Sequence, residues 1–259
     1  MSALHLIRVP LTMSALARWA GERGWLPGRT VAFDEGRALH HLVDEAFGPG
    51  VLRPFRLLVA PRSGDGNLYS YSSQDGEELR CALRHFALPD HLCVLREERL
   101  ASKAMPSDWS VGQRLGFDVR VRPVRRLHKD LVTPRGRFRN GSELDAFLSE
   151  ALHRYPENRE GMADGKRSRE AVYLDWLAER LECAAEVDRQ ATRMVRFHRT
   201  RVARGERVHE GPDATIHGTL TVTQPEAFGH LLARGVGRHR AFGFGMILLR
   251  PLQHSAPIR

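Results

Sequence analysis

A glycine-rich segment near the end of the chain combines backbone freedom with positive charge. Between residues 235 and 245 it holds Gly235, Gly237, Arg238, His239, Arg240, Gly243 and Gly245. Glycine adopts positive φ values and lets a backbone come close to a ligand. Backbone amides can then face phosphate oxygens, and guanidinium groups grip such oxygens through paired donors. The segment, called the glycine segment below, therefore predicts contacts with phosphate groups.

The glycine segment differs from two common nucleotide-binding loops. A Walker loop would end in Gly-Lys-Ser or Gly-Lys-Thr, and no such sequence follows here. A Rossmann fingerprint leads from a strand into a helix. Here the glycines follow a predicted helix at 225–233 and precede a predicted strand at 246–249. The segment thus indicates phosphate binding of a different kind.

The charge of the chain points to a polyanionic partner. The formal net charge is +9, and arginine supplies nearly all of the positive charge because the lysines are only Lys103, Lys129 and Lys166. Arginine binds phosphate bidentately and stacks on bases. A GC-rich genome would favour arginine as well, so the ratio of arginine to lysine leaves both explanations open.

The basic residues gather in two blocks, 114–140 and 189–207, which flank an acidic stretch at 141–188. This layout predicts a shaped electrostatic surface for a nucleic acid, with an ordinary solvated face as the alternative. The candidate nucleic-acid-binding side chains of the first block are Arg120, Arg122, Arg125, Arg126, Arg135, Arg137 and Arg139.

The sequence gives little support to several other classes. Cys81, Cys93 and Cys183 form no CxxC pair, and the histidines form no His-Glu-x-x-His pattern, so we expect neither a metal nor a cofactor. The N-terminus has no basic start or long apolar stretch. The longest uncharged apolar run, near 241–249, is too short to span a bilayer. We therefore expect a cytoplasmic protein without a membrane partner.

The hydrophobic pattern predicts an α+β scaffold for these residues. In the first half, the predicted elements follow the order β, α, β, β, α, β of a ferredoxin-like or RRM-like domain. They comprise strands at 4–9, 55–60, 68–71 and 92–99 and helices at 12–24, 35–47 and 77–86.

The second half repeats this order. Its predicted strands lie at 115–122, 194–202, 216–222 and 246–249, and its helices at 168–182 and 225–233. An insertion at about 129–167 contains a predicted helix, Ser142–Tyr155, capped by Ser142. We interpret the insertion as a projection that clamps a ligand or as a mobile surface loop. The prediction is two tandem ferredoxin-like (RRM-like) domains, 1–110 and 111–259, with a helical insertion in the second.

Three segments of the second half resemble a known family. They are the glycine segment with the strand and helix before it, the strand at 115–122 followed by Pro-Val-Arg-Arg, and the helix around 174–181. Together they resemble the CRISPR-associated repeat endoribonucleases of the RAMP superfamily, closest to the CasE kind. A divergent member from a minimal CRISPR system is a second option. The resemblance is specific within residues 112–252 and loose over residues 1–110.

The resemblance implies an enzyme that binds CRISPR repeat hairpins through the glycine segment and the basic blocks. It implies cleavage of precursor crRNA by the ribose 2′-OH without a metal, which leaves a 2′,3′-cyclic phosphate and a 5′-OH. The mature crRNA would stay bound and join other subunits of a CRISPR ribonucleoprotein complex, as part of antiviral defence.

The resemblance also implies a site. His40 fits the family's catalytic histidine, and histidine suits proton transfer because it titrates near neutrality. Many relatives have a tyrosine three residues earlier, where this sequence has Arg37. Arg37, with Arg23, would stabilise the phosphorane while His40 moves protons, or the arginines would carry the site themselves. A non-catalytic guide-RNA scaffold subunit and an unrelated RRM-type protein are the alternatives; the second lacks visible aromatic RNP strands.

Overall fold

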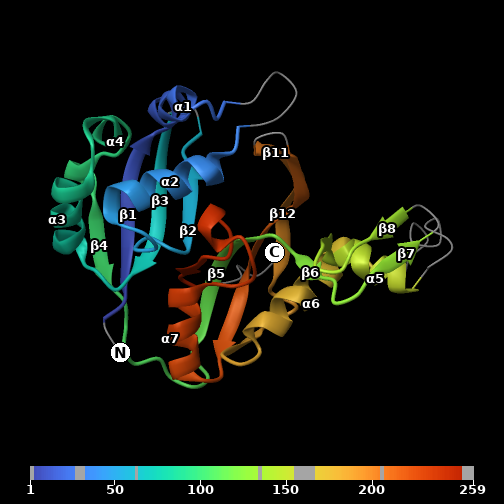
Figure 1. Cartoon of the computed structure of the whole chain (residues 1–259). Helices are drawn as coiled ribbons and strands as arrows, with labels where there is room; N and C mark the ends of the chain where they lie inside the picture. Colours follow the sequence, from blue (N-terminus) through green and yellow to red (C-terminus); the bar gives the residue numbers. More distant parts are fainter. Residues whose placement is uncertain are drawn as a thin grey trace.

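Two antiparallel sheets organise the chain (Figure 1). The computed structural model describes residues 3–26, 33–61, 64–133, 136–154, 167–204 and 207–252. The first sheet has the strand order β2-β3-β1-β4, and the second has the order β10-β12-β5-β13 with β11 also paired to β12. Both are the sheet of a ferredoxin-like domain, so the predicted α+β fold of two tandem copies is confirmed.

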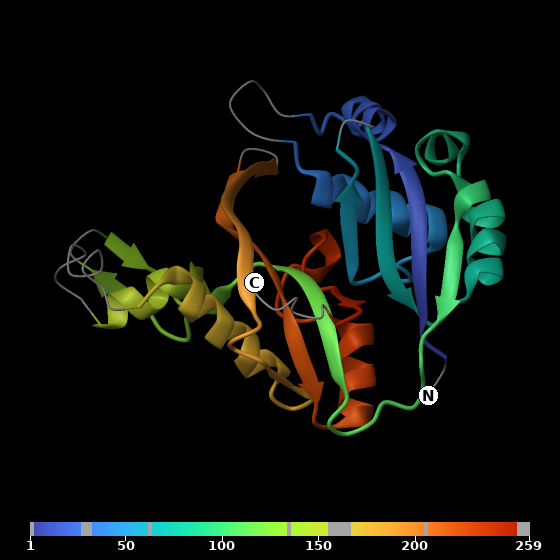
Figure 2. The ribbon, with the colours of Figure 1, turned by 180° about the vertical axis from the view of Figure 1, so that it is seen from behind.

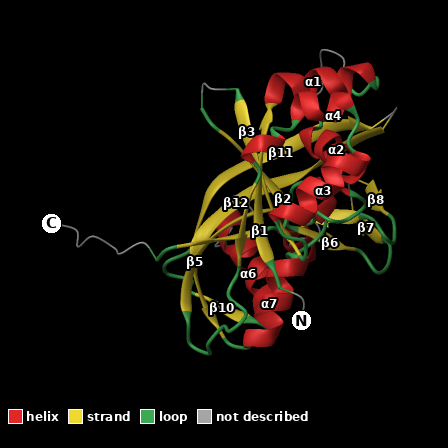
Figure 3. Cartoon of the chain, turned by 90° about the vertical axis from the view of Figure 1, so that its left-hand side faces the viewer, coloured by secondary structure: helices red, strands yellow, loops and turns green. Residues whose placement is uncertain are grey.

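The N-terminal sheet and its helices follow the predicted order closely. The strands are β1 (His5–Thr12), β2 (Phe55–Val59), β3 (Asp65–Ser72) and β4 (Ala101–Ala104), and the helices are α1 (Met13–Glu22), α2 (Glu35–Phe47), α3 (Gly76–Phe86) and α4 (Pro89–Val94). Helix α2 begins where the Asp34 carboxylate accepts a hydrogen bond from the Arg37 amide. Helices α1 to α4 lie on one side of the strands (Figure 3).

One predicted strand of this half is wrong. Residues 92–94 end α4, Leu95 makes only an isolated β-bridge with Leu11, and residues 97–99 form a short 3-10 helix. The strand that pairs with β1 comes later, as β4. Pro89 occupies the first turn of α4, where its missing N–H costs nothing. The His91 ring accepts a hydrogen bond from the Leu88 amide at 3.1 Å and so caps the same turn.

The two faces of the N-terminal sheet serve two different cores. Ile7 and Val9 of β1 pack into the core beneath α2, while Leu6 packs against the core of the second half. Successive side chains of a strand point to opposite faces, so each face of this sheet can pack against a different hydrophobic core. Tyr71 of β3 anchors the junction, since its hydroxyl donates to the Ile247 carbonyl at 3.0 Å and burial raises its pKa.

The C-terminal sheet carries one strand pair much longer than expected. Its elements are β5 (Arg114–Val121), α6 (Arg169–Leu181), β10 (Ala185–Val187), β11 (Arg193–Arg204), β12 (Arg207–Val222), α7 (Pro225–Arg234) and β13 (Ile247–Arg250). Residues 214–221 of β12 pair with β5, whereas residues 207–213 pair with β11 alone. The β11–β12 hairpin thus extends beyond the sheet, toward the level of the N-terminal helices (Figures 1 and 2).

The insertion projects from the C-terminal half, away from the N-terminal sheet (Figures 1 and 2). It contains β6 (Val124–Arg126), β7 (Leu131–Thr133), β8 (Gly136–Phe138), β9 (Glu143–Asp145) and α5 (Ala146–Arg154). The predicted helix start is wrong, because residues after Ser142 first pair with β6 as β9. Asp145 caps the first turn, where its carboxylate accepts from the Phe147 amide at 2.9 Å. The projection is therefore partly β rather than purely helical.

The predicted boundary at residue 110 falls between β4 and β5, the strands that end the first sheet and begin the second. The domain limits themselves remain a prediction. Within the described ranges, no helix is both long enough and apolar enough to cross a lipid bilayer.

Candidate functional site

The glycine segment lies directly against helix α2. A Cβ atom on Gly36, in the first turn of α2, would stand 2.6 Å from the Phe242 carbonyl oxygen. One turn later, the His40 ring packs edge-on against the Phe242 ring, with 5.2 Å between centroids. The sequence-based site required α2 to face the glycine segment across the junction, and the structure has this arrangement.

Positive φ values give the glycine segment its tight path. Gly245 has φ +81°, and a Cβ there would overlap the Val236 carbonyl oxygen. The Val236 amide in turn donates to the Gly245 carbonyl at 2.8 Å, which closes the segment on itself. Gly237, with φ +73°, leaves room for the Trp176 ring, which a Cβ would approach to 2.7 Å. The glycines are thus required by packing as well as by backbone conformation.

A basic cavity of about 760 Å³ opens between the glycine segment and the turn after α2. Its lining side chains include Arg53, Arg234, Arg238, His239, Arg240, Phe242 and Glu143. Four arginines face a single carboxylate in this set, so the cavity has positive potential. Such a cavity attracts a phosphodiester backbone.

His40 does not line this cavity itself but contacts two residues that do, Arg53 and Phe242. Two polar groups lie beside its Nδ1 atom. The Arg53 Nη2 atom lies 3.0 Å from His40 Nδ1, and an Asp44 carboxylate oxygen lies 3.6 Å from the same nitrogen. Arg53 also pairs with Asp44. A guanidinium only donates, so the Arg53 contact requires an unprotonated Nδ1, whereas a protonated Nδ1 would donate to Asp44 instead. No pattern in the sequence pointed to Arg53. The place of Asp44 could be predicted, since it lies one helical turn after His40 on α2.

The insertion reaches the glycine segment through Glu143. The Glu143 carboxylate lies 2.6 Å from Nε2 of His239 in the cavity wall, and it also pairs with Arg238. The His239 hydrogen bond, aided by Arg238, lowers the pKa of Glu143 to about 2. His239 itself has φ 60°, which non-glycine residues rarely adopt. Glu143 therefore holds two predicted RNA-binding residues in a strained turn.

We expect Glu143→Gln to reduce the acid sensitivity of the fold. The folded-state pKa lies below the ordinary 4.5, so the carboxylate stabilises the fold above that pH and loses its contribution as the pH falls toward about 2. Urea unfolding at about pH 5 and about pH 3 should show a smaller loss of unfolding free energy in the variant than in the wild type. The exposed Glu98→Gln serves as the control. An identical loss in wild type and Glu143→Gln would contradict this coupling.

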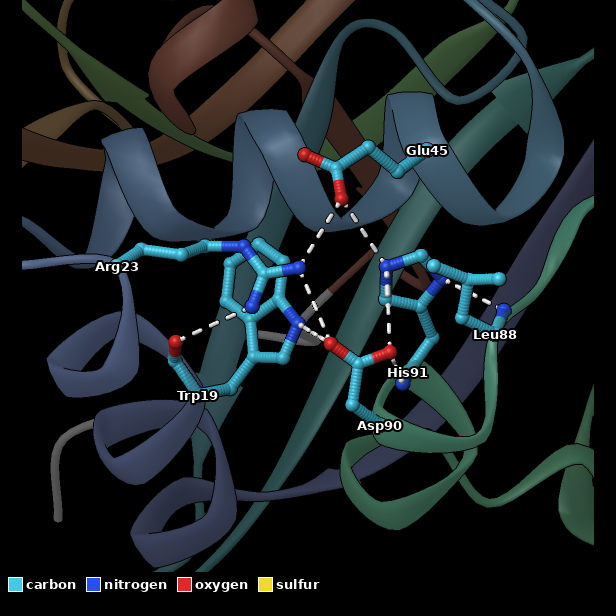
Figure 4. A network of polar contacts seen from close by, with 6 residues as sticks. All are labelled: Trp19, Arg23, Glu45, Leu88, Asp90 and His91. Carbon is cyan, nitrogen blue, oxygen red and sulfur yellow. Dashed lines mark hydrogen bonds and ion pairs between the residues drawn. The ribbon is translucent and has the colours of Figure 1, made fainter.

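Arg23 and Arg37 do not join His40. The Arg23 guanidinium reaches Glu45 of α2 at 3.4 Å and Asp90 of α4 at 3.0 Å, beside the Trp19 ring (Figure 4). The Arg37 guanidinium lies over the Trp25 ring, 4.6 Å from its centroid. Arg23 thus connects α1 to α2 and α4. The contacts of its guanidinium group do not place it beside His40, so its predicted role in catalysis remains a prediction.

A buried histidine completes that network. His91 is 1% exposed, and its Nε2 lies 3.1 Å from a Glu45 oxygen, while the Trp19 indole donates to Asp90 at 3.1 Å (Figure 4). Nδ1 of His91 accepts from a backbone amide, so Nε2 donates to Glu45. The network joins α4 to α2. Neither His91 nor Asp90 could be found from the sequence, because their contacts with Glu45 and Trp19 depend on the tertiary fold.

Arg120 and Arg122 are held inside the C-terminal half. Arg120 hydrogen-bonds the buried Asp213 carboxylate, and both guanidinium groups lie over the Phe244 ring. Arg122 is 6% exposed. The alternation of β5 is as predicted, but these arginines meet Asp213 of the neighbouring strand β12 and Phe244 of the glycine segment. Both side chains position that segment, and direct RNA contact by either one remains a prediction.

The other arginines of the first block lie at or near the surface. Arg126 and Arg139 are exposed, Arg125 bonds Glu179 at 2.7 Å, and Arg137 pairs with Asp130. Arg135 lies outside the described residues. The described members are thus distributed over β6 and the projecting β7–β8 hairpin. Their contacts with RNA remain predictions.

In the described part of the chain, no three His, Cys, Asp or Glu side chains gather in a way that would hold a metal ion.

The fold and the site define a protein of two ferredoxin-like domains with an arginine-lined cavity at their junction. A model of the CRISPR associated protein family matches residues 4–251. The chain therefore belongs to the CRISPR-associated protein family. A comparison with proteins of curated function finds no match.

Solved structures share the fold at low identity. Cse3 of Thermus thermophilus, bound to an RNA that represents a pre-cleavage complex, has a TM-score of 0.62 and 16% identity. The CRISPR-associated protein Cas6e of Escherichia coli K-12 has a TM-score of 0.52 and 18% identity. Each alignment covers 96% of this chain and 100% of the other. The CRISPR endoribonuclease Cse3 bound to a 19-nucleotide RNA has a TM-score of 0.61 and 17% identity, again with 96% and 100% covered.

Proposed function

We propose that this protein is an endoribonuclease that binds CRISPR repeat hairpins and cleaves precursor crRNA. The observation that carries the proposal is the position of His40, which stands beside an arginine-lined cavity and packs on the glycine segment. Family membership and the fold shared with Cse3 and Cas6e support it. The proposed site of action is the cytoplasm.

The proposed reaction uses the nucleophile that RNA carries. The ribose 2′-OH attacks the adjacent phosphorus, a 2′,3′-cyclic phosphate forms, and the 5′-oxygen leaves as a hydroxyl. The protein must align these atoms, move a proton and stabilise the charge on phosphorus. His40 would move the proton, and the cavity arginines would stabilise the charge. This chemistry needs no metal.

RNA binding would extend from the cavity along the basic surface. Arg238, His239 and Arg240 would contact the phosphates near the cleavage point, while Arg126 and Arg139 would contact more distant ones. A structural relative forms part of a CRISPR RNA-guided surveillance complex, with a TM-score of 0.53 and 15% identity. We propose that this chain likewise keeps its product and joins other subunits.

The alternative is a scaffold subunit that holds guide RNA without cutting it. A scaffold requires the basic surface but has no use for a histidine that an arginine and a carboxylate hold next to the cavity wall. The His40–Arg53–Asp44 contacts therefore favour the enzyme.

We expect the purified protein to cleave a labelled CRISPR repeat hairpin in EDTA. The expected 5′ fragment carries a cyclic phosphate, and the 3′ fragment carries a 5′-OH, because the nucleophile comes from the RNA. End-group analysis with a phosphatase and a polynucleotide kinase distinguishes these ends from hydrolytic ones. Cleavage that occurs only when Mg²⁺ is added, or products with a 5′-phosphate, would exclude this mechanism.

A further inference from the structure

We propose, on the basis of the proposed function, that His239 is a second catalytic residue, whose Nδ1 atom takes the proton of the attacking 2′-OH while Glu143 positions the ring. His239 lies in the glycine segment and lines the basic cavity. In the proposed function His40 alone transfers protons, although the reaction needs one transfer at each end of the phosphate. One proton leaves the 2′-oxygen, and another arrives at the 5′-oxygen.

The contact with Glu143 decides which nitrogen of His239 can accept a proton. Nε2 of His239 lies 2.6 Å from a carboxylate oxygen of Glu143, which belongs to β9 of the insertion. This hydrogen bond, aided by Arg238, lowers the pKa of Glu143 to about 2, so the carboxylate is ionised at neutral pH and can only accept. Nε2 must therefore donate, and it carries the proton of the neutral ring. Nδ1 then has the lone pair that a general base needs.

The Nδ1 atom of His239 is open to a ligand in the cavity. The His239 side chain is 23% exposed, and among the described residues no group hydrogen-bonds its Nδ1. When Nδ1 takes a proton the ring becomes a cation, and the Glu143 carboxylate at the opposite nitrogen stabilises that charge. A base that is oriented by a third group in this way is the usual means of activating a hydroxyl nucleophile.

The backbone at His239 is strained, although the neighbouring positions avoid such strain. His239 has φ 60°, where a Cβ atom crowds the backbone. Within the part of the chain that the structure describes, it is the one non-glycine residue with positive φ, and the glycine segment has glycine at its other such positions. Strain of this kind gathers at functional sites. It indicates that the imidazole of His239 has a function that glycine cannot supply.

His239 and His40 contact the same aromatic ring. The centroid of the Phe242 ring lies 6.4 Å from that of His239 and 5.2 Å from that of His40. In an in-line displacement, the attacking and leaving oxygens lie on opposite sides of phosphorus, so the base and the acid must be two separate groups held near each other. The two histidines meet this requirement.

The proposed step moves one proton in and one proton out. Nδ1 of His239 takes the proton of the 2′-OH, the 2′-oxygen bonds to phosphorus, and the bond from phosphorus to the 5′-oxygen breaks. The electron pair of that bond stays on the 5′-oxygen, which takes a proton from His40 in its protonated form. His239 ends protonated and His40 ends neutral, and proton exchange with water restores both.

His239→Asn removes the base while the turn can keep its conformation, because asparagine tolerates positive φ better than most residues. We expect single-turnover cleavage of a repeat hairpin at saturating enzyme to slow by roughly 10²–10⁴-fold. Hairpin affinity should stay close to that of the wild type, because proton transfer takes place only in the transition state. His85→Asn, at an exposed histidine of α3, should cut at the wild-type rate.

Two variants of Glu143 test its positioning role. Glu143→Gln retains an oxygen that can accept from Nε2 of His239, whereas Glu143→Ala retains none. At saturating enzyme, Glu143→Gln should therefore keep more of the cleavage rate than Glu143→Ala. Equal rates for the two variants would contradict the positioning of His239 by Glu143.

A hairpin with sulfur in place of the bridging 5′-oxygen assigns the base and the acid. A thiolate leaves without a proton near neutral pH, so this RNA needs the base and not the acid. We expect His40→Ala to cut it at close to the wild-type rate and His239→Asn to remain slow. Recovery of His239→Asn on this RNA would overturn its assignment as the base, and continued slow cleavage by His40→Ala would overturn the assignment of His40 as the acid.

Wild-type cleavage by folded His239→Asn would refute the catalytic role of His239 and leave the proposed function intact. If His239→Asn does not fold, His239→Gly decides, because glycine adopts φ 60° without strain and offers no side chain for proton transfer. A wild-type rate in that variant would refute the role equally. A wild-type protein that cuts no repeat RNA would refute the proposed function, and the role of His239 with it.

Discussion

His40→Ala is expected to slow cleavage of a repeat hairpin by roughly 10²–10⁴-fold, the usual contribution of a general acid or base. Hairpin affinity should stay nearly unchanged, because a group that only moves protons in the transition state adds little to ground-state binding. The His40 ring packs on Phe242 of the cavity wall, and Arg53 keeps its pairing with Asp44 when the ring is removed. The variant therefore removes this proton-transfer group and leaves the cavity arginines in place.

The neighbouring residue provides a matched control for this variant. The His41 ring packs on Trp25, with centroids 4.6 Å apart, whereas the His40 ring packs on Phe242, which lines the basic cavity. His41→Ala should therefore cut at close to the wild-type rate in single-turnover reactions at saturating enzyme. If His40→Ala cuts as fast as the wild type while Arg37→Ala is inactive, the site is centred on arginine and the histidine assignment is wrong.

Gly245→Ala is expected to damage both stability and RNA binding. The residue has φ +81°, and a Cβ would overlap the Val236 carbonyl oxygen, a backbone atom that cannot rotate away. Strain in this region of φ costs on the order of 1–3 kcal/mol, and the backbone contact adds to it. The glycine segment must open to relieve the contact, which displaces Arg238 and Arg240 from the cavity. Hairpin affinity should fall by at least about tenfold.

Gly24→Ala is the control that separates the effect of backbone strain from the effect of the steric contact. Gly24 has φ +70°, and a Cβ there would meet no atom within 4 Å. Its alanine variant should thus lose stability from backbone strain alone and should bind the hairpin like the wild type. Urea unfolding and filter binding measure the two effects. Equal unfolding free energies for the two variants would show that the glycine segment tolerates a side chain at Gly245.

The fold was predictable from the sequence where one local signal dominated. The alternation of β5 and the apolar stripe of α2 each depend on neighbours in sequence, and both elements appear within a residue of their expected bounds. The pattern of residues 92–99 was ambiguous, since Val94 and Leu95 are buried in either a strand or a helix. Pro89 and the His91 cap decide for the helix.

The site was less predictable because its contacts cross long distances in sequence. The interaction of α2 with the glycine segment joins His40 to Phe242, and the sequence alone could not establish it. Arg53 lies in a turn with no motif, and Glu143 lies in the insertion, so no local pattern marks either one. Arg120 shows the same limit, because the sequence could not reveal that its guanidinium hydrogen-bonds Asp213.

The most direct test of the central claim is a repeat hairpin with a single 2′-deoxy nucleotide on the 5′ side of the scissile phosphate. The account predicts that the protein binds this RNA with wild-type affinity and does not cut it, while the all-ribose hairpin yields a 2′,3′-cyclic phosphate in EDTA. Cleavage of the deoxy-substituted hairpin at the same position would show that the nucleophile is not the 2′-OH, and the proposed mechanism would be wrong.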